Sequence, residues 1–187
     1  MKRLVILFVA FSACGAGAAD RPPAVAGAFY TADPVVLRSQ IDEFLEAGEG
    51  TAPVRALVVP HAGYVYSGAV AGKAFAGVDA SSTRRVILLG PSHHMAFEGG
   101  ALPARDITAF TTPLGDLAVD TEFLATLRKH RDFNGPPAAH GPEHCLEVEL
   151  PFIQVTAPEA RIVPILEGNE TDLVTARRMA AALVPLL

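Results

Sequence analysis

Three short apolar segments, residues 55–59, 85–89 and 161–166, most strongly constrain how this chain can fold. Their side chains do not alternate between apolar and polar, as they would in a strand with one face in water. Stretches with helical spacing separate them, and Pro60 and Gly90 end the first two. Apolar strands that alternate with helices are typical of a parallel sheet buried on both faces. We therefore predict an α/β fold, a three-layer α/β/α sandwich with a mainly parallel sheet.

The helices between these strands begin at recognisable capping residues. Asp33 followed by Pro34 is a typical helix start, and Asp120 and Ser67 offer caps for two further helices. The spacing of apolar residues predicts helices over about 33–47, 67–78, 120–130, 146–153 (which Pro151 would disturb) and from 171 onward. Residues 98–116 are predicted to hold one or two short strands with a turn near 112–115.

Residues 1–19 have the layout of a secretory signal peptide: a basic start, an apolar run from Leu4 to Phe11, and small residues up to Ala19. That run is too short to span a bilayer, so we expect no transmembrane segment in the mature chain. An exported protein, periplasmic or secreted, is the first expectation. The alternative is a lipoprotein signal that ends before Cys14, which would anchor the chain through that residue.

The remaining residues, 20–187, suit one domain. Half of the 187-residue chain is hydrophobic, which permits a sizeable core, and the net charge of −5 argues against nucleic acid as a partner. The last predicted helix ends in an apolar stretch, and the alternation of strands and helices stops where another strand would be due. We therefore expect a fold that is truncated at the C-terminus, either naturally or because the chain is a fragment.

Three histidines follow two of the predicted strands. His61 comes directly after residues 55–60, and His93 and His94 come directly after residues 85–91. Ligands of open α/β sheets bind beyond the carboxyl ends of the strands, so these imidazoles are predicted to form a functional edge, where Tyr64 and Ser92 supply hydroxyls. Imidazole binds transition metals and acts as a general acid or base. The alternative is that some of these histidines only hydrogen-bond neighbouring loops.

A second polar cluster lies at residues 140–149. It contains His140, Glu143 and His144, with Glu147 and Glu149 beyond them. The sequence leaves two interpretations open, a part of the site or a capped helix start with solvated carboxylates. The neighbouring Cys145 has no cysteine partner once residues 1–19 are removed, so it is either buried and inert or a free thiol.

These motifs together resemble the Memo-like family, whose bacterial members are called AmmeMemoRadiSam system protein B. The matching stretches are residues 21–30, 60–68, 89–94, 112–116 and 143–152, in the family's order and spacing. The resemblance implies a fold like that of the class III extradiol dioxygenases and a cleft that holds iron or copper. It also implies partners of the radical-SAM and AMMECR types.

The resemblance assigns individual roles to some residues. It implies His61 and His93 as metal ligands, with His94 behind them and His144 lining the same cleft. Family members continue for roughly another hundred residues. That part carries a Ser-Asp-x-x-His loop with a third histidine, and it also carries a cleft cysteine, which Cys145 does not match. We therefore expect the site encoded here to lack its third ligand.

The sequence supports two different kinds of function. The first is a metal-dependent redox protein, an oxidoreductase by fold resemblance, with a histidine-lined, dioxygenase-like cleft. The alternative is a non-catalytic module that binds a peptide or small molecule, or an inactive truncated family member. Whether the chain is an enzyme is left open by the sequence.

Overall fold

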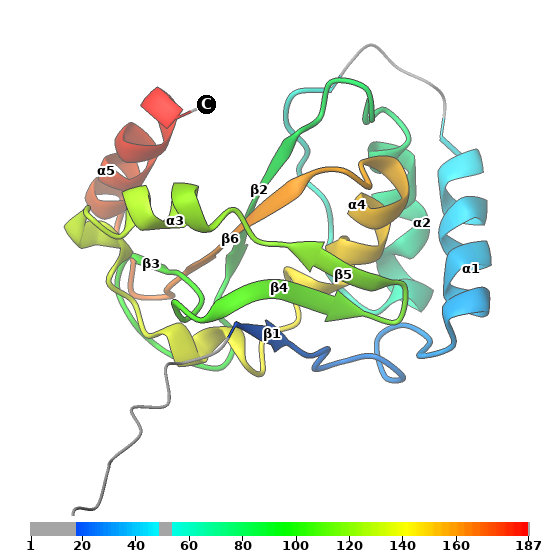
Figure 1. Ribbon diagram of the computed structural model, residues 1–187, viewed down its shortest axis with the longest axis horizontal. Helices are drawn as coiled ribbons and strands as arrows, with labels where there is room; N and C mark the ends of the chain where they lie inside the picture. Colours follow the sequence, from blue (N-terminus) through cyan, green and yellow to red (C-terminus); the bar gives the residue numbers. More distant parts are fainter. Residues whose placement is uncertain (1–17, 49–53, 187) are drawn as a thin grey trace, which may run out of the picture.

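The computed structural model describes residues 18–48 and 54–186, and it has the predicted α/β class (Figure 1). Most of the predicted signal peptide, Cys14 included, lies outside these residues. Within them, no helix is both long enough and apolar enough to cross a membrane. The strands are β1 (Ala19–Arg21), β2 (Arg85–Pro91), β3 (Gly100–Ala101), β4 (Ile107–Thr112), β5 (Gly115–Ala118) and β6 (Arg161–Glu167). The α-helices are α1 (Pro34–Glu46), α2 (Tyr64–Phe75), α3 (Thr121–Leu127), α4 (Leu150–Thr156) and α5 (Leu173–Leu183).

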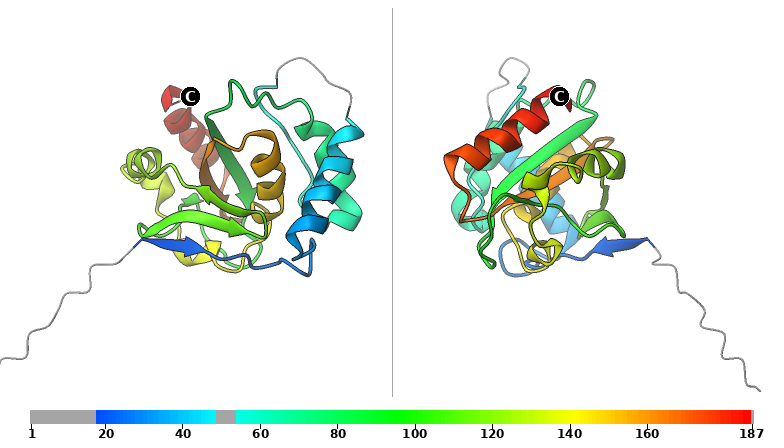
Figure 2. Two further views of the ribbon diagram at one scale, coloured as in Figure 1. Left: turned by 45° about the vertical axis from the view of Figure 1, so that its right-hand side comes forward. Right: turned by 90° about the vertical axis from the view of Figure 1, so that its left-hand side faces the viewer.

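The six strands form two small mixed sheets of three strands each. One has the order β2-β6-β3, in which β2 runs parallel to β6 over residues 85–91, and β3 runs antiparallel to it. The other has the order β1-β4-β5, with β1 parallel to β4 and a β4–β5 hairpin at the predicted turn. Figure 2 shows α1 and α2 together on one side of the molecule and α5 on the other.

Aspartate side chains cap the N-termini of three helices, which begin at or within two residues of the predicted starts. The side chain of Asp33 accepts hydrogen bonds from the amides of Val35 and Val36 at the start of α1. Asp120 accepts from the amide of Phe123 at the start of α3, which ends three residues before the predicted boundary at 130. Asp172 caps α5 in the same way. Pro151 lies in the first turn of α4, where its missing N–H costs nothing.

Two predictions of local structure were wrong. Residues 55–59 do not form a strand, because no strand of the described chain pairs with them, and Val58 is fully exposed. Ser67 does not cap the second helix, which already begins at Tyr64 with Gly63 as its cap. The Ser67 hydroxyl instead donates to the carbonyl of Ala62, which draws the preceding loop against the helix.

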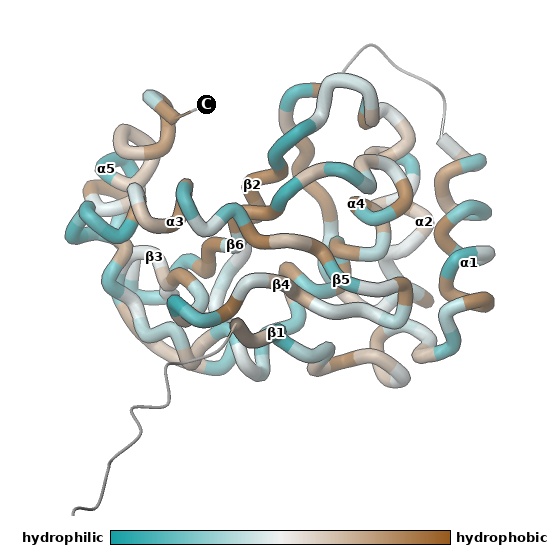
Figure 3. The backbone as a smooth tube through the Cα atoms, viewed as in Figure 1, coloured by the Kyte–Doolittle hydropathy of each residue, from teal (hydrophilic) through white to brown (hydrophobic). Residues whose placement is uncertain are grey.

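The core lies between the helices and the β2-β6-β3 sheet. In Figure 3, brown, apolar stretches run along β2 and β6. The fully buried ring of Phe152 packs against Phe44, Tyr64 and Phe75 with ring centroids 5.1–6.3 Å away. Helix α2 approaches α1 closely because Gly72 has no side chain: a Cβ at this position would lie 2.5 Å from the Cβ of Phe44 and 2.6 Å from its carbonyl oxygen. This contact fixes α2, and therefore the loop just before it.

We predict that Gly72→Ala destabilises the protein, although the same change inside an exposed helix stabilises by about 1 kcal/mol. The added methyl group meets the backbone of α1, which cannot move without opening the core, and overpacking of this kind costs roughly 1–3 kcal/mol. Chemical denaturation measures the change. The exposed Ala69→Gly exchange on the same helix is the control and should lose about 1 kcal/mol. An increased stability of Gly72→Ala would contradict the close packing.

Candidate metal centre

Three imidazoles meet at one end of the β2-β6-β3 sheet. His61 lies in the loop before α2, His93 follows β2, and His144 lies in the loop before α4. Their rings are 4.5–6.0 Å apart between centroids, and one ring nitrogen from each lies within 4.8 Å of the others. Ligand nitrogens about 2.1 Å from one ion are roughly 3–4 Å apart, a spacing that modest rotations of these rings can reach. The three residues can therefore hold one metal ion.

The buried carboxylate of Glu143 organises this cluster. One oxygen accepts a hydrogen bond from the backbone amide of His93 at 2.7 Å, and the other contacts the Nδ1 of His93 at 2.9 Å. The second oxygen also accepts from the amides of His144 and Cys145 at 2.9 and 3.1 Å. When the Nδ1 of His93 carries the proton of this bond, its Nε2 has a free lone pair for a metal.

Burial and the neighbouring groups favour a neutral His61, a neutral His144 and an ionised Glu143, the forms that a metal needs. Burial alone would raise the pKa of Glu143, but the hydrogen bonds from His93, Cys145 and His144 outweigh it and lower this pKa to about 2. The pKa of His61 is lowered by burial and by the neighbouring His93. Burial also lowers the pKa of His144, although Glu143 opposes the shift. Neutral imidazoles beside an ionised carboxylate are suited to metal binding near neutral pH.

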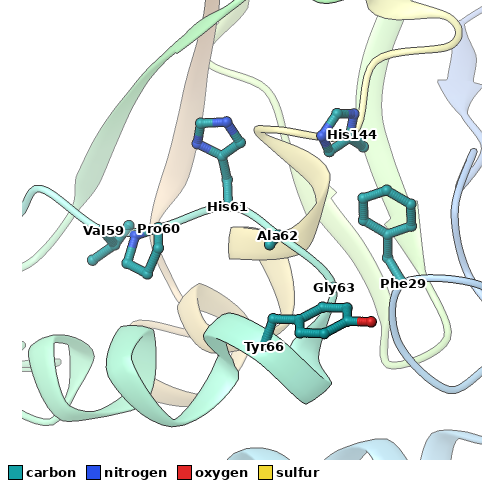
Figure 4. A pocket seen from close by; sticks show the side chains of 8 residues that line it. All are labelled: Phe29, Val59, Pro60, His61, Ala62, Gly63, Tyr66 and His144. Carbon is teal, nitrogen blue, oxygen red and sulfur yellow. The ribbon is translucent and has the colours of Figure 1, made fainter.

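An open pocket of about 570 Å³ adjoins the cluster, with His61 and His144 on its wall. Figure 4 shows the ring of Phe29 beside His144, and Tyr66 and Pro60 around the rest of the opening. The Phe29 and His144 rings lie 4.8 Å apart. A mostly apolar pocket with imidazoles on one side suits a small molecule, or one side chain of a larger one, that presents a polar group to the histidines.

Comparison with known proteins identifies the family of the chain. A family profile described as Memo-like protein matches residues 21–186, nearly the whole described region. The chain belongs to the Memo-like family. It is 38% identical to a MEMO1 family protein of Methanopyrus kandleri over 178 residues, which cover 88% of this chain and 62% of that protein. It is 40% identical to Protein MEMO1 of Xenopus tropicalis over 149 residues, 76% of this chain and 50% of that protein. The chain thus spans only about half to three fifths of these relatives.

Within this Memo-like chain the predicted site residues have different positions. His61, His93 and His144 lie together, and His94 is next to them, with its exposed ring 6.3 Å from that of His144. Tyr64 does not line the pocket: it is buried in the core, where its hydroxyl donates to the carbonyl of Val148. Ser92 is also buried, and its hydroxyl donates to the carbonyl of Met95 in the same loop. Tyr66, two residues further along α2, lies on the pocket wall.

The structure brings a third imidazole, that of His144, to the two that the resemblance implies as ligands in this Memo-like chain. The loop that begins at His140 folds back over the end of the sheet, and it brings the ring of His144 within 4.5 Å of that of His93. The loop can approach because Gly90 lacks a side chain: a Cβ there would lie 2.7 Å from the Sγ of Cys145. Cys145 itself is buried, and burial and Glu143 raise the pKa of its thiol, so it is inert.

The carboxylates of this loop are buried rather than solvated, so the interpretation of a solvated helix start was wrong. Glu147 forms a buried ion pair with Arg21, a partner that sequence reasoning missed because 126 residues separate them. One oxygen of Glu149 has no hydrogen-bond partner, the only such buried side-chain atom in residues 18–48 and 54–186. Burial raises the pKa of Glu149 to about 8, so this side chain is mostly protonated at neutral pH.

We predict that Glu149 makes stability fall as pH rises. Its pKa is about 8 in the folded protein and near 4.5 in the unfolded chain, so the unfolded state loses its proton first. The folded protein is therefore at its most stable with respect to Glu149 below about pH 4.5, and this contribution to the free energy of unfolding is lost as pH rises to 8. Glu149→Gln removes this loss and should be more stable than the wild type by roughly 3–5 kcal/mol above pH 9, and by much less at pH 4.

Urea denaturation at several pH values tests this prediction. The exposed Glu46→Gln exchange is the matched control and should leave the pH profile unchanged. If the difference between Glu149→Gln and the wild type is the same at pH 4 and pH 9, Glu149 is ionised in the folded protein and the prediction is wrong.

Proposed function

We propose that this Memo-like chain binds a redox-active metal ion, iron or copper, through His61, His93 and His144. The observation that supports the proposal is the convergence of three imidazoles, from three separate loops, to within 4.8 Å of one another. Imidazole ligands suit both metals. Three ligands on one side of an ion leave its other positions free for a molecule in the adjoining pocket.

The surroundings of the histidines support the same function. In metal sites, a ligating histidine usually donates its second N–H to a carboxylate, which fixes the ring and raises its basicity. Glu143 contacts the Nδ1 of His93 in this way and lies 3.2 Å from the Nδ1 of His144. Glu143 therefore orients the ring of His93 and holds the backbone of His144 beside it. An iron or copper ion bound there would supply one-electron redox chemistry, while the chain positions the histidines and the pocket excludes water from part of the bound molecule.

The pocket also favours a second candidate function, binding of a peptide or small molecule without turnover. Its walls are mostly apolar, and Phe29 and Tyr66 offer large contact surfaces that need no metal. A ligand screen on metal-free and metal-loaded protein separates the two candidates. Ligands that bind only in the presence of metal favour the metal-dependent function, and ligands that bind equally well without it favour the binding module.

We predict that His61→Ala, His93→Ala and His144→Ala each lower the affinity for copper or iron by at least about a hundredfold. Each change removes one of three ligands, whereas loss of an orienting group outside the ligand set costs roughly 10–100-fold. Competition with a chelator of known affinity measures the effect. The exposed His130 lies just after α3 and outside the three histidine loops, so His130→Ala is the control and should bind normally.

Failure of the purified wild type to bind either metal above the level of the His61→Ala variant would contradict the proposed function. Loss of affinity only in His61→Ala and His93→Ala would instead exclude His144 as a ligand and restrict it to the pocket wall.

We also propose that the protein is exported and acts outside the cytoplasm. The proposal is supported by the sequence of residues 1–19 and by the position of β1, which begins at Ala19, at the end of the predicted signal peptide. Mass spectrometry of the protein from its native host is expected to find a mature N-terminus at Ala19 or Asp20. A lipid-modified N-terminal Cys14 would support the lipoprotein alternative, and an intact Met1 on cytoplasmic protein would contradict export.

A further inference from the structure

Arg21, at the end of β1, is buried in the loop that carries Glu143 and His144. The residue is only 5% exposed, and its guanidinium lies over the ring of Phe110. It donates to the carbonyl oxygens of His140 and Glu143 and more weakly to that of Gly141. It also forms the ion pair with Glu147. One side chain thus binds four groups spread over residues 140–147, a segment with little regular backbone hydrogen bonding of its own.

Glu147 extends this connection back to the N-terminal segment. Its fully buried carboxylate accepts hydrogen bonds from the amides of Ala24 and Val25, at 2.8 and 3.0 Å, and from the Tyr30 hydroxyl at 2.8 Å. Burial and the nearby Glu147 raise the pKa of Tyr30, so its hydroxyl remains a donor throughout the physiological range. Residues 21–30 and 140–147 are therefore packed as one unit, in which Phe29 contacts the ring of His144.

We propose that Arg21 is a positioning residue for the histidine cluster and acts through Glu143. Arg21 holds the backbone of Glu143, and the carboxylate of Glu143 holds both the ring and the amide of His93 and the amide of His144. Arg21 is not a metal ligand itself. The inference deepens the proposed function and rests on it, because the position of the rings matters only if they bind a metal.

The geometry requires an arginine at this position. A guanidinium presents five N–H donors in a rigid plane, so it can bind a carboxylate and several carbonyls at once. A lysine keeps the charge that Glu147 needs but offers a single ammonium group, which cannot reach the same set of acceptors. Arg21→Lys should therefore preserve much of the fold while it loosens residues 140–147. Orienting groups outside the ligand set typically change metal affinity by about 10–100-fold.

The experiment compares Arg21→Lys and Tyr30→Phe with the wild type in the full chain. Arg178→Lys is the matched control, because Arg178 also forms an ion pair with a carboxylate, that of Asp132, which is not part of the histidine loops. Copper affinity is measured by chelator competition, and the Cu(II) electron paramagnetic resonance spectrum reports the geometry of the ligands. Thermal unfolding of the metal-free proteins reports stability.

We expect Arg21→Lys to bind copper about 10–100-fold more weakly with an altered spectrum, and Tyr30→Phe to show a smaller change in the same direction. Arg178→Lys should keep the affinity and spectrum of the wild type even if it unfolds at a lower temperature. A folded Arg21→Lys with wild-type affinity and spectrum would overturn the proposal.

Hydrogen exchange of the metal-free proteins separates this inference from the proposed function. If the wild type binds no metal, the proposed function fails, and exchange still tests the positioning. Faster exchange confined to residues 141–149 in Arg21→Lys or Tyr30→Phe, and not in Arg178→Lys, would support Arg21 as the residue that holds this loop. Unchanged exchange in that segment would overturn the inference.

Discussion

The candidate site depends above all on the carboxylate of Glu143. It accepts four hydrogen bonds, two from His93 and one each from the amides of His144 and Cys145. These bonds join the loop after β2 to the loop before α4, which no β ladder connects. They also explain why a buried carboxylate stays ionised, since the donors replace the water that burial removes. An ionised Glu143 therefore holds the ring of His93 and the backbone of His144 next to each other.

The parts of the fold that follow from local chemistry could be predicted from the sequence. Asp33, Asp120 and the apolar runs that become β2 and β6 were sufficient to place two helices and two strands to within about three residues. The position of His93 was predictable because it follows the apolar run that becomes β2, whereas His61 reaches the same place from a segment that is not a strand. The pairing of Arg21 with Glu147 was not, because no local pattern connects residues 126 apart. The resemblance placed His144 in the same cleft, but its position beside His93 could not be predicted, because it depends on contacts between segments far apart in the sequence.

Residues 55–59 show that a strand needs a neighbour as well as a suitable sequence. Their aliphatic side chains predict a buried strand, but β2 is an edge strand of the described structure and does not pair with them. Without a ladder, Val58 is fully exposed and Leu89 of the edge strand β2 is half-exposed, while Leu57 and Val59 are only partly buried against the core. The segment is apolar enough for a strand, but the prediction that it pairs as one was wrong. His61 keeps its position without a strand because Ser67 and the close packing of α2 on α1 hold the loop from its other end.

The three glutamates of the site loop show how strongly surroundings determine the chemistry of one side chain. Hydrogen bonds from four donors keep Glu143 ionised, an arginine and three further donors surround Glu147, and Glu149 has an oxygen with no partner at all. Glu149 therefore escapes the cost of a buried charge only by keeping its proton, and its pKa rises to about 8. Buried polar groups of this kind rarely increase stability over an apolar packing, so their concentration in one short loop argues for a role in function. In this loop Glu143 and Glu147 serve to place His93 and His144. The cost of burying Glu149 must be offset by the stability of the rest of the domain.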